Sequence, residues 1–133
     1  MKYMLDTNIC IYVIKHNVPN VIQTFLSHQP NDLCISSITY AELVYGVQKS
    51  SRPERNMTAL VKFLSSIQVV DFDAAAAFSY GQIRADLERK GTPIGNMDML
   101  IAAHALSQKL TLVTNNTGEF LRVFGLSVEN WAG

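Results

Sequence analysis

The sequence predicts an α/β fold in which a central, mostly parallel sheet of four to five strands lies between two layers of helices. Short apolar runs alternate along the chain with longer segments in which apolar residues recur every three or four positions. The first pattern is typical of buried strands and the second of amphipathic helices. Their alternation indicates parallel strands joined by helices on both faces of the sheet. Because 48% of the 133 residues are hydrophobic and no linker or repeat is present, we expect a single domain over residues 1–133.

The first predicted strand runs directly into a helix. Residues 2–5 are apolar or amphipathic, and Asp6, Thr7 and Asn8 then interrupt the run before it becomes apolar again. This sequence is too polar at one point for a continuous core strand, so we predict a strand, a tight turn and a helix from residue 9 to about residue 16. Thr7 or Asn8 is expected to supply the oxygen that caps the helix.

Turn residues divide the middle of the chain into further elements. Ser36 or Ser37 can cap one predicted helix, and Pro53 suits the first turn of the next. The expected elements are helices at 21–27, 37–50 and 53–66 and strands at 33–36 and 68–72.

The last third of the chain begins with the longest predicted helix, which opens with an alanine run and is closed by Gly91. Asn96 is expected to cap the helix that follows the next loop. The expected elements are helices at 73–90 and 97–108, strands at 110–114 and 126–128, and a turn that becomes a short helix within 115–120.

Composition narrows the classes of protein that this chain can belong to. Its eleven basic and eleven acidic residues cancel, which argues against a protein that holds duplex DNA on its own. Cys10 and Cys34 lie in apolar surroundings without a CxxC pair, so we expect them reduced in the core. The N-terminus does not resemble a secretory signal, and no apolar run approaches the roughly 20 residues that span a bilayer. We therefore expect a cytoplasmic protein that does not use a membrane.

Three acidic residues have unusually apolar neighbours. Asp6 follows the first strand, Glu42 interrupts an apolar helix, and Asp98 lies between two methionines. Each has an ordinary explanation on its own: a helix cap, a solvated helix face, and an acid that favours the dipole of a first helical turn. Together they carry more weight, because all three are expected near the carboxyl edge of the sheet, where open α/β folds bind their ligands.

Other polar groups are expected at the same edge. Thr114, Asn115 and Asn116 end a later strand, and Glu119 follows within one turn. Carboxylates that converge without lysine or arginine between them repel one another unless a cation binds. A site of oxygen ligands alone selects Mg²⁺ or Mn²⁺ over Zn²⁺, and such a site suits phosphodiester hydrolysis.

Four stretches of the chain resemble the PIN-domain ribonucleases, and specifically the VapC toxins of bacterial toxin–antitoxin pairs. They are residues 4–8, 38–46, 95–105 and 113–116, the last followed by Glu119 and Phe120. The resemblance runs from end to end, and residues 91–95 with Trp131 are similar to the enterobacterial branch. It implies a PIN-like three-layer fold.

The resemblance also implies roles for individual residues. Asp6, Glu42 and Asp98 correspond to acids that bind one or two Mg²⁺ or Mn²⁺ ions, and Glu119 joins them as a catalytic residue. Many relatives have an aspartate at the position of Asn116, and a neutral amide is a poorer Mg²⁺ ligand, so we expect Glu119 to reach in instead. The positions that support this metal shell are Thr7, Asn8, Thr114, Asn115 and Asn116.

The implied activity is that of an endoribonuclease on structured RNA, with tRNA, and initiator tRNA at its anticodon loop, as the expected substrate and inhibition of translation as the result. A loop fits this role, because side chains can read splayed bases but not a deep A-form groove. His104 is expected to be packed or hydrogen-bonded rather than catalytic. Candidate phosphate contacts, which solvated surface charge explains equally well, are Lys15, Lys49, Arg52, Arg55, Arg84, Arg89 and Lys90.

The resemblance further implies a homodimer held inactive by a cognate VapB-type antitoxin. The antitoxin covers the acidic groove, often with an arginine, and supplies the surface that binds operator DNA. Candidate partner contacts are the apolar face of residues 57–64 and the tyrosines Tyr40, Tyr45 and Tyr80, which core packing explains equally well.

Three other classes of protein share part of this pattern. A phosphatase of the haloacid dehalogenase type needs a second aspartate where this chain has Asn8, and a response-regulator receiver needs paired acids that are missing. A PIN-like module that binds RNA or a partner without cutting remains the alternative. Asn116 supports this alternative, and the three retained acids argue against it.

Overall fold

A five-stranded sheet forms the centre of the computed structural model, which describes residues 1–133, and its strand order is β3-β2-β1-β4-β5. Every neighbouring pair of strands is parallel. The predicted α/β class and the parallel sheet are therefore confirmed. The strands are β1 (Tyr3–Leu5), β2 (Leu33–Ser36), β3 (Gln68–Val70), β4 (Thr111–Val113) and β5 (Val128–Glu129).

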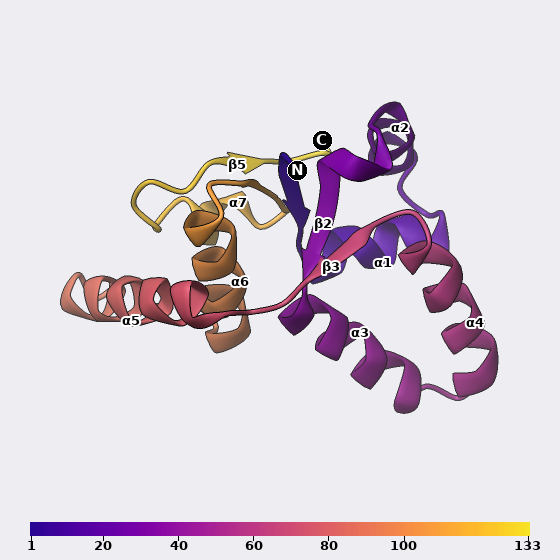
Figure 1. The fold of residues 1–133 in the computed structure, drawn as a ribbon, viewed down its shortest axis with the longest axis horizontal. Coiled ribbons are helices and arrows are strands. Elements are labelled where there is room, and N and C mark those ends of the chain that lie inside the picture. Colours follow the sequence, from indigo (N-terminus) through magenta and orange to yellow (C-terminus); the bar gives the residue numbers. More distant parts are fainter.

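Helices cover both faces of the sheet, as the sequence predicted. In Figure 1, α5 and α6 lie to the left of the sheet, and α1, α3 and α4 lie to its right. The helices are α1 (Thr7–Lys15), α2 (Pro19–Ser27), α3 (Ser37–Gln48), α4 (Pro53–Leu64), α5 (Ala74–Arg89), α6 (Asn96–Ser107) and α7 (Thr117–Phe120), and a single 3₁₀ turn, η1, spans Pro30–Asp32. No helix is long and apolar enough to cross a membrane.

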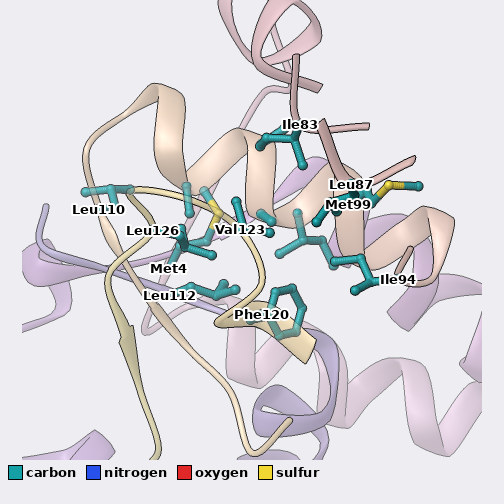
Figure 2. Packing of buried hydrophobic residues seen from close by; sticks show 14 of the residues in the cluster. Met4, Ile83, Leu87, Ile94, Met99, Leu110, Leu112, Phe120, Val123 and Leu126 are labelled. Carbon is teal, nitrogen blue, oxygen red and sulfur yellow. The ribbon is translucent and has the colours of Figure 1, made fainter. Parts of the chain in front are cut away.

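Two hydrophobic cores lie on opposite faces of the sheet, because successive strand residues point to opposite sides. Met4 and Leu112 enter the core under α5 and α6, whereas Leu5 and Val113 enter the core under α1 to α4. Figure 2 shows the first of these cores, in which the strand residues meet Phe120 of α7. Cys10 and Cys34 are buried free thiols, as predicted.

Two predicted helix caps are wrong. The side chain of Asp6 caps α1 by accepting a hydrogen bond from the Ile9 amide over 2.9 Å, so Thr7 is already the first helical residue. At α6 the helix begins at Asn96 itself, and Gly95 occupies the capping position without a side-chain bond. In both places several neighbouring residues are able to cap the helix, and the backbone conformation determines which of them does so.

The last strand also differs from the prediction. β5 covers Val128 and Glu129, later than the predicted 126–128. The chain turns at Gly125, whose φ of 82° lies in the left-handed region that glycine tolerates. After this turn Leu126 is buried in the core, and pairing with β4 begins only at Val128.

Candidate functional site

Parallel pairing of β1 with β4 brings two polar residues together at the carboxyl edge of the sheet. Leu5 pairs with Val113, and the Asp6 amide donates to the Val113 carbonyl over 3.0 Å. Asp6 and Thr114, the next residues along the two strands, are both buried, with 5% and 0% of their surface exposed. Burial raises the pKa of the Asp6 carboxyl, against the lowering effects of the Thr114 hydroxyl and the Ile9 amide.

Glu42 reaches this edge from α3. The helix starts directly after β2, where the Ser36 side chain accepts a hydrogen bond from the Ile38 amide over 3.0 Å. Glu42 lies in the middle of the helix, and its Oε1 accepts a hydrogen bond from the Thr7 hydroxyl over 2.6 Å. The negative charge of Glu42 also raises the pKa of Asp6, so the two carboxylates are near enough to repel each other.

Asp98 and Glu119 complete the cluster. Asp98 lies in the first turn of α6, and Glu119 lies on α7. Burial, followed in order of size by the charges of Glu119, Asp6 and Glu42, raises the pKa of Asp98 to about 6. The parallel sheet therefore brings together all four acids that the sequence singled out.

No lysine or arginine neutralises this cluster. The two ion pairs of the structure both lie on α5, between Arg84 and Glu88 and between Lys90 and Asp86. Carboxylates that share a partly buried site without a counter-charge disfavour their ionised forms, in agreement with the raised pKa values of Asp6 and Asp98. A divalent cation would relieve this repulsion.

The donor atoms fit Mg²⁺ or Mn²⁺, because carboxylate and hydroxyl oxygens are their preferred protein ligands. No three His, Cys, Asp or Glu side chains lie close enough together to enclose one ion as they stand. This spacing still suits Mg²⁺, which usually takes only one or two protein carboxylates and retains several waters. Asp6, Asp98, Glu42 and Glu119 are the residues that could hold it.

The PIN domain family model matches residues 3–125 of the chain. This chain belongs to the PIN domain family. A protein of Shigella flexneri named tRNA(fMet)-specific endonuclease VapC is 52% identical over 132 residues, which cover 99% of each chain. The protein of the same name in Salmonella typhimurium is 50% identical over 131 residues, or 98% of each chain. These relatives place the chain in the VapC branch of the family.

Solved structures of VapBC toxin–antitoxin complexes share the fold. The VapBC2 complex of Rickettsia felis bound to a DNA fragment from its promoter contains a chain with a TM-score of 0.93 and 46% identity, which covers 98% of this chain and 99% of that one. The DNA-bound VapBC complex of Salmonella typhimurium gives a TM-score of 0.93 and 48% identity over 98% of both chains. The three-layer PIN fold is therefore confirmed.

Most of the polar positions singled out by the VapC resemblance lie around the carboxylates. The Asn116 side-chain amide donates to Glu119 Oε2 over 2.9 Å, and the Asn116 backbone amide donates to Thr114 Oγ1 over 2.9 Å. The Asn115 side chain donates instead to the Tyr12 hydroxyl over 2.7 Å. Asn8 is exposed and forms no side-chain hydrogen bond with this cluster.

Tyr12 is the residue that sequence reasoning missed. It lies on α1 and contacts Asn115 across 103 residues of sequence. No local pattern signals such a contact, because Tyr12 looks like one more apolar residue in the run that follows Asn8. The Tyr12 hydroxyl therefore lies beside the polar cluster, on the side where α1 packs.

The candidate phosphate contacts divide into engaged and free side chains. Arg84 is bonded to Glu88 and to the Tyr80 hydroxyl, and Lys90 is paired with Asp86, so neither is free. The Lys49 ammonium lies 4.9 Å from the centre of the Tyr45 ring. Exposed residues without an ion pair are Lys15, Arg52, Arg55 and Arg89.

A groove of about 270 Å³ opens beside Glu42, between α1, α3 and α4. Its walls are largely apolar, with Ile11, Ile14 and Leu43 among them, and Lys15 lies at its rim. On the predicted apolar face of residues 57–64, Leu60 is buried, Met57 and Leu64 are half-buried, and Val61 is 59% exposed. The groove differs from this face in that Glu42 lines it, which places it next to the carboxylates.

The predicted partner tyrosines differ in exposure. Tyr40 and Tyr45 are 40% and 65% exposed on α3, whereas Tyr80 is half-buried and bonded to Arg84. His104, expected to be packed or hydrogen-bonded, is fully buried with Nδ1 2.8 Å from Ser36 Oγ, so that prediction is confirmed.

Proposed function

We propose that this VapC-family chain is a metal-dependent endoribonuclease that cuts structured RNA, with tRNA, and initiator tRNA at its anticodon loop, as the substrate. The observation that carries the proposal is the cluster of Asp6, Glu42, Asp98 and Glu119, whose charges raise the Asp98 pKa without a lysine or arginine to balance them. Two close relatives named as tRNA(fMet)-specific endonucleases support the substrate class.

Three of the four acids form a hydrogen bond within the protein and can also bind a ligand. One oxygen of Asp6 caps α1, one oxygen of Glu42 accepts from Thr7, and one oxygen of Glu119 accepts from Asn116. Each bond restricts the rotation of a carboxylate and occupies one of its lone pairs, so the remaining lone pairs can still accept a ligand. When bound, Mg²⁺ supplies Lewis-acid activation of water and balances charge at the scissile phosphate.

The ionisation of Asp98 depends on pH and on whether a cation is bound. With a pKa of about 6 it is largely ionised at neutral pH, and a divalent cation would hold it ionised at lower pH as well. Among the neighbouring charges, that of Glu119 raises the pKa of Asp98 most, so these two carboxylates form a candidate ligand pair.

RNA would approach across the basic side chains that carry no ion pair. Lys15 lines the groove that Glu42 also lines, which places one positive charge next to the acidic cluster. Arg52 and Arg55 lie at the start of α4, at the α3–α4 turn, exposed to solvent. Contacts of this kind position the phosphate backbone, whereas loop bases provide the sequence information. Cleavage of initiator tRNA would inhibit translation.

A VapB-type antitoxin is the proposed inhibitor, and a homodimer is the proposed assembly. The apolar groove beside Glu42 suits an amphipathic segment, and an arginine from that segment would satisfy the carboxylates much as a metal does. Related chains occur in VapBC complexes bound to DNA. For this neutral chain, operator binding would come through the antitoxin.

A second candidate is a PIN module that binds RNA or a partner without cutting it. The observation that favours it is that no three acids enclose a single ion, and that Asn116 beside them is a neutral amide. The retained cluster of four acids favours the nuclease, because a binding module gains nothing from repelling charges.

Cleavage of purified tRNA by the wild-type chain, Asp6→Asn and Asp98→Asn separates the two candidates. We expect discrete cleavage with Mg²⁺ that is lost with EDTA and in both variants, because each removes a ligand charge. Asp32→Asn, at the opposite edge of the sheet, is the matched control and should cut normally. RNA binding without cleavage by the wild-type chain would favour the binding module.

A further inference from the structure

His104 lies at a junction between the two helices that carry Glu42 and Asp98. It belongs to α6, is fully buried, and places Nδ1 2.8 Å from the Ser36 hydroxyl at the end of β2. The Phe72 ring meets the imidazole edge-on, with centroids 5.4 Å apart and planes at 76°. His104 therefore contacts two residues that are distant in sequence: it is hydrogen-bonded to Ser36, 68 positions away, and packs against Phe72, 32 positions away.

Ser36 has a second partner in α3. Its Oγ accepts the Ile38 amide over 3.0 Å and caps the helix. The neighbouring Ser37 hydroxyl accepts the Phe72 amide over 3.0 Å, which holds the segment after β3 to the same point. One small polar junction thus joins β2, the start of α3, the end of β3 and the middle of α6.

The proton arrangement at this junction follows from its partners. Burial lowers the pKa of His104 below its ordinary range, against the raising effects of Asp73 and Asp71, so the ring is neutral at pH 7. Because Ser36 already accepts the Ile38 amide, its own hydroxyl proton is free to be donated to Nδ1. The ring proton then lies on Nε2, which is buried beside the backbone carbonyl of Asp71, although no hydrogen bond of good geometry forms between them.

The poor contact of Nε2 bears on why a histidine occupies the position. A buried N–H with only a poorly placed acceptor adds little stability, so an apolar side chain of similar size would serve packing alone about as well. What an apolar side chain cannot provide is the bond to Ser36. The bond ties the middle of α6 to the residue that caps α3.

The geometry points to His104 as a positioning residue whose bond to Ser36 holds α6 against α3 and so sets the place of Asp98 relative to Glu42. Ser36 precedes Glu42 by six residues and Asp98 precedes His104 by six, so each acid lies roughly 9 Å along its helix from the bond. This inference rests on the proposed nuclease function. It assigns His104 no contact with substrate or metal.

Steady-state cleavage of tRNA by His104→Leu, His104→Asn and Ser36→Ala tests the positioning role. Loss of the bond in His104→Leu should lower kcat by about 10- to 100-fold and leave KM within about twofold, because misplacement of a catalytic group by 1 Å can cost about 100-fold. His104→Asn should retain most of kcat, since Oδ1 of asparagine can accept the Ser36 proton near the place of Nδ1. The double variant of His104→Leu with Ser36→Ala should be no slower than the slower single variant.

Ser107→Ala is the matched control, because it removes a hydrogen bond to the His104 carbonyl within α6 and leaves the bond to Ser36 intact. Urea unfolding of every variant separates activity from stability. A His104→Leu protein that is folded and cuts at the wild-type rate would overturn the inference. So would equal losses of kcat in His104→Asn and His104→Leu.

Backbone amide shifts give a readout that does not depend on cleavage. In ¹H–¹⁵N spectra, His104→Leu should shift the amides of Glu42 and Asp98, and Ser107→Ala should leave both in place. Absence of cleavage by the wild-type chain would refute the proposed nuclease function by itself. Unchanged Glu42 and Asp98 amides in His104→Leu would refute the positioning role in either case.

Discussion

Asn116 donates a hydrogen bond from its side-chain amide to Glu119 Oε2 over 2.9 Å, three residues farther along the chain. The residue that looked like a weakened metal ligand is therefore bonded to the acid expected to replace it. The amide orients Glu119, whose charge is the largest electrostatic influence on Asp98. The neutral amide of Asn116 thus has a structural role within the cluster, where it bonds to Glu119.

The first prediction concerns this bond. Asn116→Ala should lower the rate of tRNA cleavage about tenfold at saturating Mg²⁺, because a hydrogen bond to a charged group contributes on the order of 1.5 kcal/mol. Initial rates measured against Mg²⁺ concentration check it. Asn115→Ala is the control, since its amide bonds to Tyr12 and not to an acid. Equal losses in the two variants would count against a specific role for Asn116.

The second prediction concerns the Thr7–Glu42 hydrogen bond of 2.6 Å. Thr7→Val has nearly the same shape and removes the donor, so Glu42 should lose its fixed orientation and cleavage should slow about tenfold. Thr7→Ser retains the hydroxyl and should stay near the wild-type rate. Assays of kcat for both variants check the prediction, and a fully active Thr7→Val would contradict it.

The third prediction concerns the dependence of stability on pH. The pKa of Asp98 rises from 3.8 to about 6 on folding, so the folded state binds the proton more tightly than the unfolded state. Stability should therefore fall as the pH rises from about 4 to about 6, and the cost should be fully present above about 6. Asp98→Asn should remove this fall and raise the free energy of unfolding at pH 7.

Urea unfolding of the wild-type chain and Asp98→Asn between pH 4 and pH 7, without divalent ions, measures the effect. The difference between the two proteins cancels contributions common to both, including that of His104, whose lowered pKa acts in the opposite direction. Parallel stability curves for the two proteins would show that Asp98 does not titrate as described.

The fourth prediction concerns metal binding in the absence of RNA. Mg²⁺ should raise the Tm of the wild-type chain, because a ligand that binds only the folded state at 100 times its Kd stabilises it by about 2.7 kcal/mol. Asp98→Asn should largely lose this shift, and Asp86→Asn on α5, which breaks only a surface pair with Lys90, should retain it. Thermal unfolding with and without Mg²⁺ checks this. An equal shift in Asp98→Asn would place the ion elsewhere.

The strand-end acids could be predicted from sequence because the signal is local. A strand that runs into Asp6, and another that runs into Thr114, must place both residues at one edge if the sheet is parallel. Asp98 and Glu42 were recognisable because they interrupt apolar surroundings on their helices. The α/β class followed from the same alternation of strand and helix patterns.

The contacts that orient the acids could not be predicted in the same way. Tyr12 meets Asn115, and Ser36 meets His104, only through tertiary packing across 103 and 68 residues. The cap of α1 is a different case. Asp6, Thr7 and Asn8 are all good capping residues, so the sequence does not decide among them, and the backbone path selects Asp6.

The most direct test of the central claim is cleavage of initiator tRNA by the purified chain after EDTA treatment and then after Mg²⁺ is restored in excess. The account predicts no cleavage with the chelator and recovery of cuts at one discrete position once Mg²⁺ returns, with no recovery in Asp6→Asn. Cleavage that persists in EDTA, or that returns in Asp6→Asn to the wild-type rate, would contradict a nuclease built on these carboxylates.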